Sequence, residues 1–181
     1  MWDAAVLEGN PYTLPEVQTL VEGVTVTGHT LSAQDQILAL NEAYNTLDNL
    51  VGNAAFQLDK ATSDLLHREV AVHEAIESGH FRGENLITEY RQLLTYLAQL
   101  GDPREKALAY FCAATRRQFY FDGNKRTAQL MMTDHLLSHG YDAISIRARR
   151  RLEFNDKLGR MFDNGEATEM MAFIIDCRPA A

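Results

Sequence analysis

The sequence is short of cysteine and of long apolar runs, and each shortage excludes a class of protein. The 181 residues include only two cysteines, Cys112 and Cys177. Both fall in apolar helical patterns, so we expect reduced core residues in a cytoplasmic protein and no disulfide framework. No apolar stretch approaches the roughly 18 residues that span a membrane. The N-terminus also lacks the basic segment and apolar run of a signal peptide, so no membrane association is expected.

Positive charge is scarce as well. Lysine and arginine number 17 against 25 acidic residues, which gives a formal net charge of -8. This balance argues against broad binding to nucleic acid or to anionic membranes, although it leaves room for a local basic site. The basic run at residues 147–151 is expected to be a solvated helix start or part of an ion-pair network. The length and ordinary apolar fraction predict a single domain over residues 1–181.

The feature that the sequence has in abundance is helical periodicity, which predicts an all-α protein. Capping signals mark several helix starts, among them Thr13 with Glu16 and the pair Asp102-Pro103. Residues 80–90 break the helical period, because a Gly-Glu-Asn turn signal precedes a β-prone Leu-Ile-Thr, and they are predicted to form a small hairpin. The expected helices cover about 1–8, 14–23, 32–52, 63–77, 90–100, 103–117, 124–140, 148–162 and 166–177.

The stretch QFYFDGNKR, residues 118–126, lies between two apolar helices and carries the chemistry. Its Asp-Gly-Asn triplet sits where a helix begins, and the first N–H groups of a helix lack partners at the positive end of the macrodipole. Gly123 allows close approach of an anion, and Lys125 and Arg126 add positive charge, so a phosphate site is physically sound. Asp122 among these cations is explained by Mg²⁺ bridging to phosphate. The alternative is a capped helix start with solvated charges.

This loop resembles the signature loop of Fic domains, which reads His-x-Phe-x-(Asp/Glu)-Gly-Asn-(Gly/Lys)-Arg. The match runs over residues 122–126, with Tyr120 at the Phe position and Gln118 at the His position. LEGNPYTLPEVQTLVEG, residues 7–23, is similar to the N-terminal segment of many Fic proteins. GHFRGENLI, residues 79–87, is similar to the stretch before their flap hairpin. The sequence is identified as a member of the Fic/Doc family, whose fold is a helical bundle with a small β-hairpin flap.

The resemblance implies that the protein binds ATP with Mg²⁺ and transfers AMP or a phosphoryl group to a hydroxyl of a target protein that the sequence does not identify. It also implies that residues 80–90 form a flap that aligns the target. Residues 1–12 would form an inhibitory helix whose Glu8 lies against the cationic nest, although a simple turn is the alternative for Glu8. The sequence leaves the oligomeric state open, with a homo-oligomer as one alternative. The implied metal ligand is Asp122, and the implied phosphate-binding residues are Gly123, Asn124, Lys125 and Arg126.

Two departures from the family pattern affect the expected activity. Gln118 cannot act as a general base, because an amide does not titrate near neutral pH, and loss of such a base costs about 10²–10⁴-fold. AMP-transferring members usually carry a second Arg where this chain has Gln129, and Lys125 resembles the Doc variant that phosphorylates its target. We expect weak or altered transfer. The alternatives are a degenerate Fic domain that binds nucleotide or a partner, and an all-α interaction protein that binds no nucleotide.

The histidines add little to this interpretation. His135 and His139 stand four residues apart on a predicted helix, a spacing that can bind metal, but no third ligand is nearby and no site is predicted there. His67, His73 and His80 are expected at the surface or at an interface.

Overall fold

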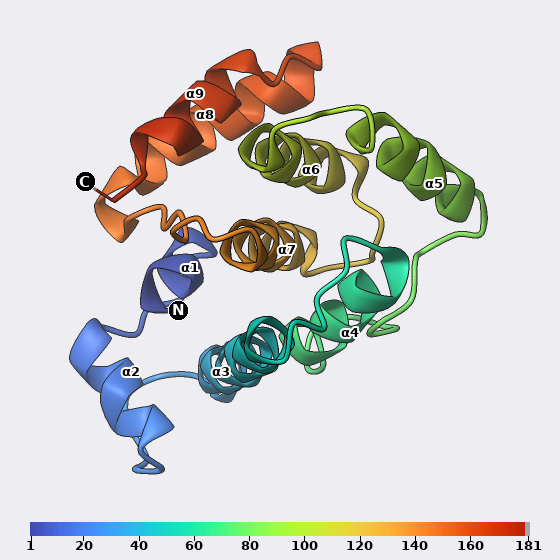
Figure 1. Ribbon diagram of the computed structural model, residues 1–181. Helices are drawn as coiled ribbons and strands as arrows, with labels where there is room; N and C mark the ends of the chain where they lie inside the picture. The colour runs from blue at the N-terminus through green and yellow to red at the C-terminus, as the bar shows by residue number, and fades with distance from the viewer. Residues whose placement is uncertain (180–181) are drawn as a thin grey trace.

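The computed structural model describes residues 1–179 and confirms the all-α prediction (Figure 1). No helix in this range is long and apolar enough to cross a membrane. The α-helices are α1 (Trp2–Leu7), α2 (Leu14–Val21), α3 (Leu31–Gly52), α4 (Lys60–Val70), α5 (Asn85–Leu97), α6 (Pro103–Arg117), α7 (Asn124–Ser138), α8 (Arg151–Asn164) and α9 (Thr168–Asp176), with a 3-10 turn η1 (Ala148–Arg150) before α8.

Helix α7 lies at the centre of the bundle, with α6 on one side and α3 and α4 on another (Figure 1). Every residue from Arg126 to Leu136 is buried. A helix that is buried all round belongs in the interior of a globular protein, where neighbouring helices cover each of its faces. The loop between α6 and α7 is therefore held at both ends by rigid, packed elements.

The helix starts follow the capping signals closely. Thr13 and Glu16 form a reciprocal capping box at α2, in which the Thr13 backbone N–H donates to the Glu16 carboxylate at 2.7 Å. Asp102 accepts the backbone N–H of Arg104 at 2.8 Å and opens α6. At α3 the capping residue is Thr30, whose hydroxyl accepts from Ala33, and the helix begins one residue before the predicted start.

The segment between α4 and α5 departs from the prediction. Helix α4 ends at Val70, well before the predicted end near residue 77, and residues 71–84 form turns and bends. Ile76, which an extension of the helix would have turned inward, is 84% exposed. The early stop frees this irregular segment to reach across to the loop before α7.

The predicted hairpin over residues 80–90 is wrong. Helix α5 begins at Asn85, and no strand forms anywhere in residues 1–179. Leu86, Tyr90 and Leu97 are the residues of α5 that are buried, and their spacing is that of one helical face. Packing of this face against the core overrides the β-propensity of the Leu-Ile-Thr stretch.

Candidate functional site

The loop of residues 118–123 joins α6 to α7 through two left-handed residues. Gln118 ends α6 with φ 53° and ψ 61°, and Gly123 opens α7 with φ 69°. A Cβ atom on Gly123 would lie 3.1 Å from the Cβ of Ala71, so glycine suits both the backbone angle and the space. Since the glycine N-cap offers no side chain, the first N–H groups of α7 stay available to another acceptor.

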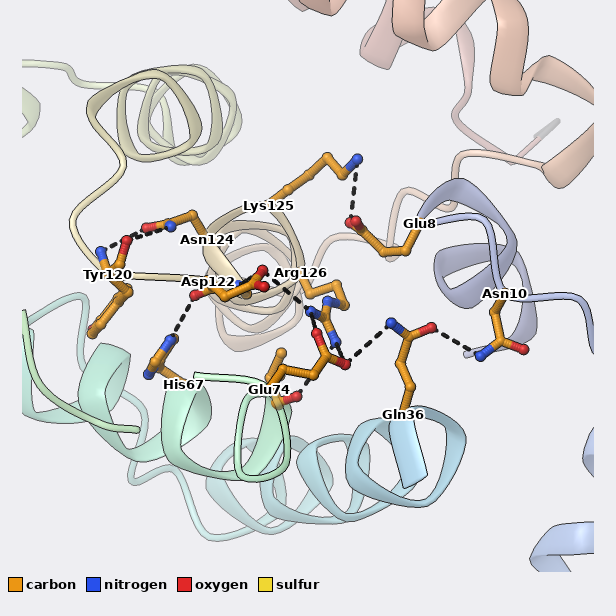
Figure 2. Close-up of polar contacts among 12 residues, drawn as sticks. Glu8, Asn10, Gln36, His67, Glu74, Tyr120, Asp122, Asn124, Lys125 and Arg126 are labelled. Atoms are coloured by element: carbon orange, nitrogen blue, oxygen red, sulfur yellow. Dashed lines mark hydrogen bonds and ion pairs between the residues drawn. The ribbon is translucent and has the colours of Figure 1, made fainter. Parts of the chain in front are cut away.

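Side chains from α4 and α7 hold the loop at Tyr120. Asn124 accepts the backbone N–H of Tyr120 at 2.8 Å and donates to its carbonyl at 2.8 Å, which closes the turn (Figure 2). The Tyr120 ring is buried, and its hydroxyl lies 2.9 Å from Asp64 and 2.8 Å from Ser63. Tyr120, which stands at the Phe position of the Fic signature, is thus a core residue that also makes two hydrogen bonds to α4.

His67 of α4 is a further anchor of the loop. Its ring stacks on Tyr120 with centroids 3.7 Å apart. Its Nδ1 accepts the backbone N–H of Gly79 at 2.8 Å, so the ring proton is on Nε2, which donates to the Asp122 carbonyl at 2.8 Å (Figure 2). Burial lowers the pKa of His67 and keeps the ring neutral. The prediction that His67 lies at the surface or at an interface is therefore wrong, since the residue is fully buried.

The Asp122 side chain points outward from this anchored backbone. Its carboxylate accepts the N–H of Gly123 at 2.6 Å and lies 3.8 Å from the Arg126 guanidinium, yet the side chain is 60% exposed. The carboxylate is open to solvent and to a ligand. No group of three His, Cys, Asp or Glu side chains that could hold a metal ion occurs in residues 1–179. Mg²⁺ sites that use substrate phosphates need only one or two carboxylates, so Asp122 fits such an ion.

The two cations of the loop have different carboxylate partners. The Lys125 ammonium lies 3.3 Å from the Glu8 carboxylate, which comes from the residue that follows α1. The Arg126 guanidinium donates to Glu74 at 3.0 Å through Nη1 and more closely through Nη2 (Figure 2). Arg126 is 3% exposed. Its guanidinium is therefore buried against Glu74, with Asp122 as a more distant second carboxylate.

Glu74 also connects the loop to α1 through α3. The Gln36 amide donates to Glu74 at 3.1 Å and accepts from Asn10 at 2.8 Å (Figure 2). Asn10 follows Glu8 closely in sequence, so both partners of the loop cations are tied to the end of α1.

These elements surround a pocket of about 200 Å³, which we call the loop pocket. Gln118 is held there, since its amide donates to the Thr115 carbonyl at 2.5 Å and accepts from Asn124 at 3.3 Å. The arrangement suits an anionic ligand with an aromatic or apolar part. The pocket is lined by Glu8, Gln118, Asp122, Gly123, Asn124 and Lys125, with Phe121, Leu158 and Phe162 as its apolar wall.

The residues that support the loop carry no signal in the sequence and were not predicted. The missed residues are Ser63, Asp64, His67 and Glu74, all more than 50 positions before their partners. His73 and His80 are exposed, as expected. The two cysteines are unpaired.

The sequence is similar to curated proteins from insects. It is 25% identical to the protein adenylyltransferase Fic of Drosophila willistoni and 26% identical to that of Aedes aegypti, in both cases over 94% of this chain. The chain spans about 38% of the length of each relative. No protein-family model matches the sequence.

Solved structures of Fic proteins share the fold of this chain. Fic-1 (residues 134–508) from C. elegans superposes with a TM-score of 0.86 at 17% identity, covering 97% of this chain and 58% of that one. A Fic domain containing signaling protein from Bacteroides thetaiotaomicron superposes with a TM-score of 0.78 at 19% identity, covering 92% of this chain and 70% of that one.

Proposed function

Because the chain belongs to the Fic family by sequence similarity and by fold, we propose that it binds ATP with Mg²⁺ at the loop pocket and transfers AMP or a phosphoryl group to a protein hydroxyl. One observation carries this proposal. The exposed Asp122 carboxylate, the N-terminus of α7 and the Lys125 ammonium share a single pocket. This combination suits a metal-bound polyphosphate.

Each residue of the pocket has a proposed task. The first N–H groups of α7 and the Lys125 ammonium hold phosphate oxygens, and Arg126 contributes its backbone N–H while its guanidinium stays with Glu74. Asp122 holds Mg²⁺, which neutralises phosphate charge when bound. Glu8 opposes phosphate binding because its carboxylate already pairs with the Lys125 ammonium. Residues 1–12 thus act as an inhibitory segment, and 80–90 form part of the surface that receives the target.

The transfer step lacks an ordinary base. When AMP is transferred, the target hydroxyl oxygen attacks the α phosphorus and pyrophosphate leaves. When a phosphoryl group is transferred, the oxygen attacks the γ phosphorus and ADP leaves. In both cases the hydroxyl proton must also leave. Gln118 can accept a hydrogen bond from the hydroxyl but cannot take the proton. The proton passes instead to a phosphate oxygen or to Asp122, and we expect the reaction to be slow.

The second candidate function is a nucleotide-binding or protein-interaction module without catalysis. The position of Gln118 favours it, since both ends of its amide are already bonded, to Thr115 and Asn124. Two unpaired cysteines suit a reducing compartment, and we place either function in the cytoplasm.

Label transfer from ATP separates these functions. Glu8→Gly removes the carboxylate beside Lys125, and Gln118→His in that background supplies a base. We expect transfer to protein to rise by about 10²-fold over Glu8→Gly alone. ATP labelled at the α or at the γ phosphate, in separate reactions, shows which group moves.

Gln118→Ala in the same background is the matched control, because it also breaks the contacts to Thr115 and Asn124 but adds no base. ATP bound without transfer by Gln118→His would favour the binding module. Wild-type transfer as fast as that of Gln118→His would contradict the role assigned to Gln118. Failure of every variant to bind ATP and Mg²⁺ would overturn the transfer reaction and the nucleotide-binding module, and would leave only the protein-interaction module.

A further inference from the structure

A basic groove lies beside the loop pocket. The groove has a volume of about 390 Å³ and is lined by three arginines, Arg82, Arg116 and Arg117. Glu89 is the one carboxylate in its lining, which leaves an excess of positive charge. This excess is local, because the chain as a whole carries a net charge of -8.

Two of these arginines are held by backbone carbonyls. Arg82 Nε donates to the Gln118 carbonyl, and Arg116 Nε donates to the Met161 carbonyl at 3.2 Å. Within residues 1–179 no carboxylate lies within 4 Å of either guanidinium, whereas Arg117 pairs with Glu89 at 2.9 Å. A carbonyl orients a guanidinium but does not neutralise it, so the remaining N–H groups are directed and still charged.

The groove is continuous with the candidate site. The backbone N–H of Arg82 donates to the Phe119 carbonyl at 2.9 Å, so the groove wall is bonded to the loop itself. Phe162 lines both the groove and the loop pocket and is 39% exposed. A chain lying in the groove would therefore pass next to Gln118.

We propose that this groove binds an acidic segment of the protein that receives the transferred group. This inference rests on the proposed function for the identity of the partner. Carboxylates match the fork of a guanidinium, and a few of them suffice to balance the groove. A nucleic acid is disfavoured, because Glu89 and the acidic surface repel a dense line of phosphates.

Peptide binding without nucleotide tests this inference apart from catalysis. The probes are three fluorescein-labelled peptides with a central serine, flanked by glutamates, by glutamines or by lysines, measured by fluorescence anisotropy at low salt. The glutamate peptide is expected to bind about tenfold more tightly than the glutamine peptide, and the preference should shrink as salt rises. Equal affinity for all three peptides would overturn the proposal, while leaving the proposed transfer reaction untouched.

Two substitutions place the binding in the groove. The double variant Arg116→Gln, Arg117→Gln should weaken glutamate-peptide binding about tenfold, while Arg104→Gln, at the opposite end of the same helix, should leave it unchanged. Equal losses in the double variant and the control would contradict the assigned position. Thermal melting checks that each variant folds.

A charge reversal keeps the proposal testable if the double variant unfolds. Arg116→Glu should lose the glutamate peptide and gain affinity for the lysine peptide, a result that simple loss of structure cannot produce. Single-stranded oligothymidylate serves as the competitor. Displacement of the glutamate peptide by sub-stoichiometric oligothymidylate would mean that the groove binds nucleic acid, and would overturn the proposal.

Discussion

Lys125 and Arg126 are neighbours in sequence, each pairs with a glutamate, and yet the two pairs lie in different surroundings. The side chains of Lys125 and Glu8 are each 21% exposed, whereas Arg126 is 3% exposed and its partner Glu74 is 19% exposed. The partially exposed pair can open for a ligand, since water and phosphate can replace either partner. The buried pair cannot, because a guanidinium left alone in the interior keeps its full desolvation cost. A single residue step along the helix thus separates a pair that is open to a ligand from a pair whose cation is buried in the fold.

Removing Glu74 should have the largest effect on stability. Glu74→Ala leaves the Arg126 guanidinium buried with the Val70 carbonyl at 3.4 Å and the mostly exposed Asp122 carboxylate at 3.8 Å as its remaining partners. We expect the free energy of unfolding to fall by about 3–5 kcal/mol, measured by urea denaturation. Arg126→Met with Glu74→Ala removes both charges and should recover much of the loss. An unchanged free energy in Glu74→Ala would mean that the pair is not buried in solution.

Within the part of the chain that the structure describes, Asp134 is a buried carboxyl that, unlike Glu74 and Glu8, has no cationic partner. Asp134 is fully buried, and neither of its oxygens has a partner in residues 1–179. Burial raises its pKa from 3.8 to about 7. The folded protein therefore favours the protonated form, and the stability that this carboxyl contributes below pH 4 is lost as the pH rises to about 7.

Asp134→Asn should stabilise the protein by about 1–3 kcal/mol at pH 8 and by little at pH 4. Denaturation curves at the two pH values give the comparison. A benefit of equal size at both pH values would show that the effect does not come from ionisation of Asp134.

Substituting Glu8 should have the smallest effect on stability. Glu8→Gln is expected to change the free energy of unfolding by less than about 1 kcal/mol, because the pair with Lys125 is partly solvated. ATP and Mg²⁺ should bind severalfold more tightly, since the competing carboxylate is gone. Calorimetric titration measures this change, with Glu22→Gln, an exposed glutamate at the end of α2, as the control. Affinity that rises equally in both variants would indicate a general charge effect.

The sequence allows prediction wherever the cause of a structure is local. The capping box at Thr13, the start of α6 at Asp102 and the start of α7 after Gly123 each depend on residues a few positions apart, and the structure confirms them. The contact between Glu8 and Lys125 was expected because the family resemblance placed them together.

Prediction failed where the cause is distant in the chain. His67 and Glu74 carry no local pattern that marks them as supports of the loop, because their partners Asp122 and Arg126 lie more than 50 residues further on. The hairpin failed for a similar reason. The β-prone Leu-Ile-Thr stretch is helical because Leu86 and Tyr90 pack into a core that the surrounding window of sequence does not reveal.

The tautomer of His67 has a consequence for how the segment 71–84 opens. A doubly protonated imidazole cannot accept the N–H of Gly79, so acid removes the bond that ties this segment to α4. Because the pKa of His67 is lowered, stability is lost as the pH falls from about 6.5 toward the folded value. The amide hydrogen of Gly79 should then exchange with solvent through local opening at mildly acidic pH, while α7 stays protected until the whole protein unfolds. We therefore expect the segment beside the loop pocket to loosen in acid before α7 does.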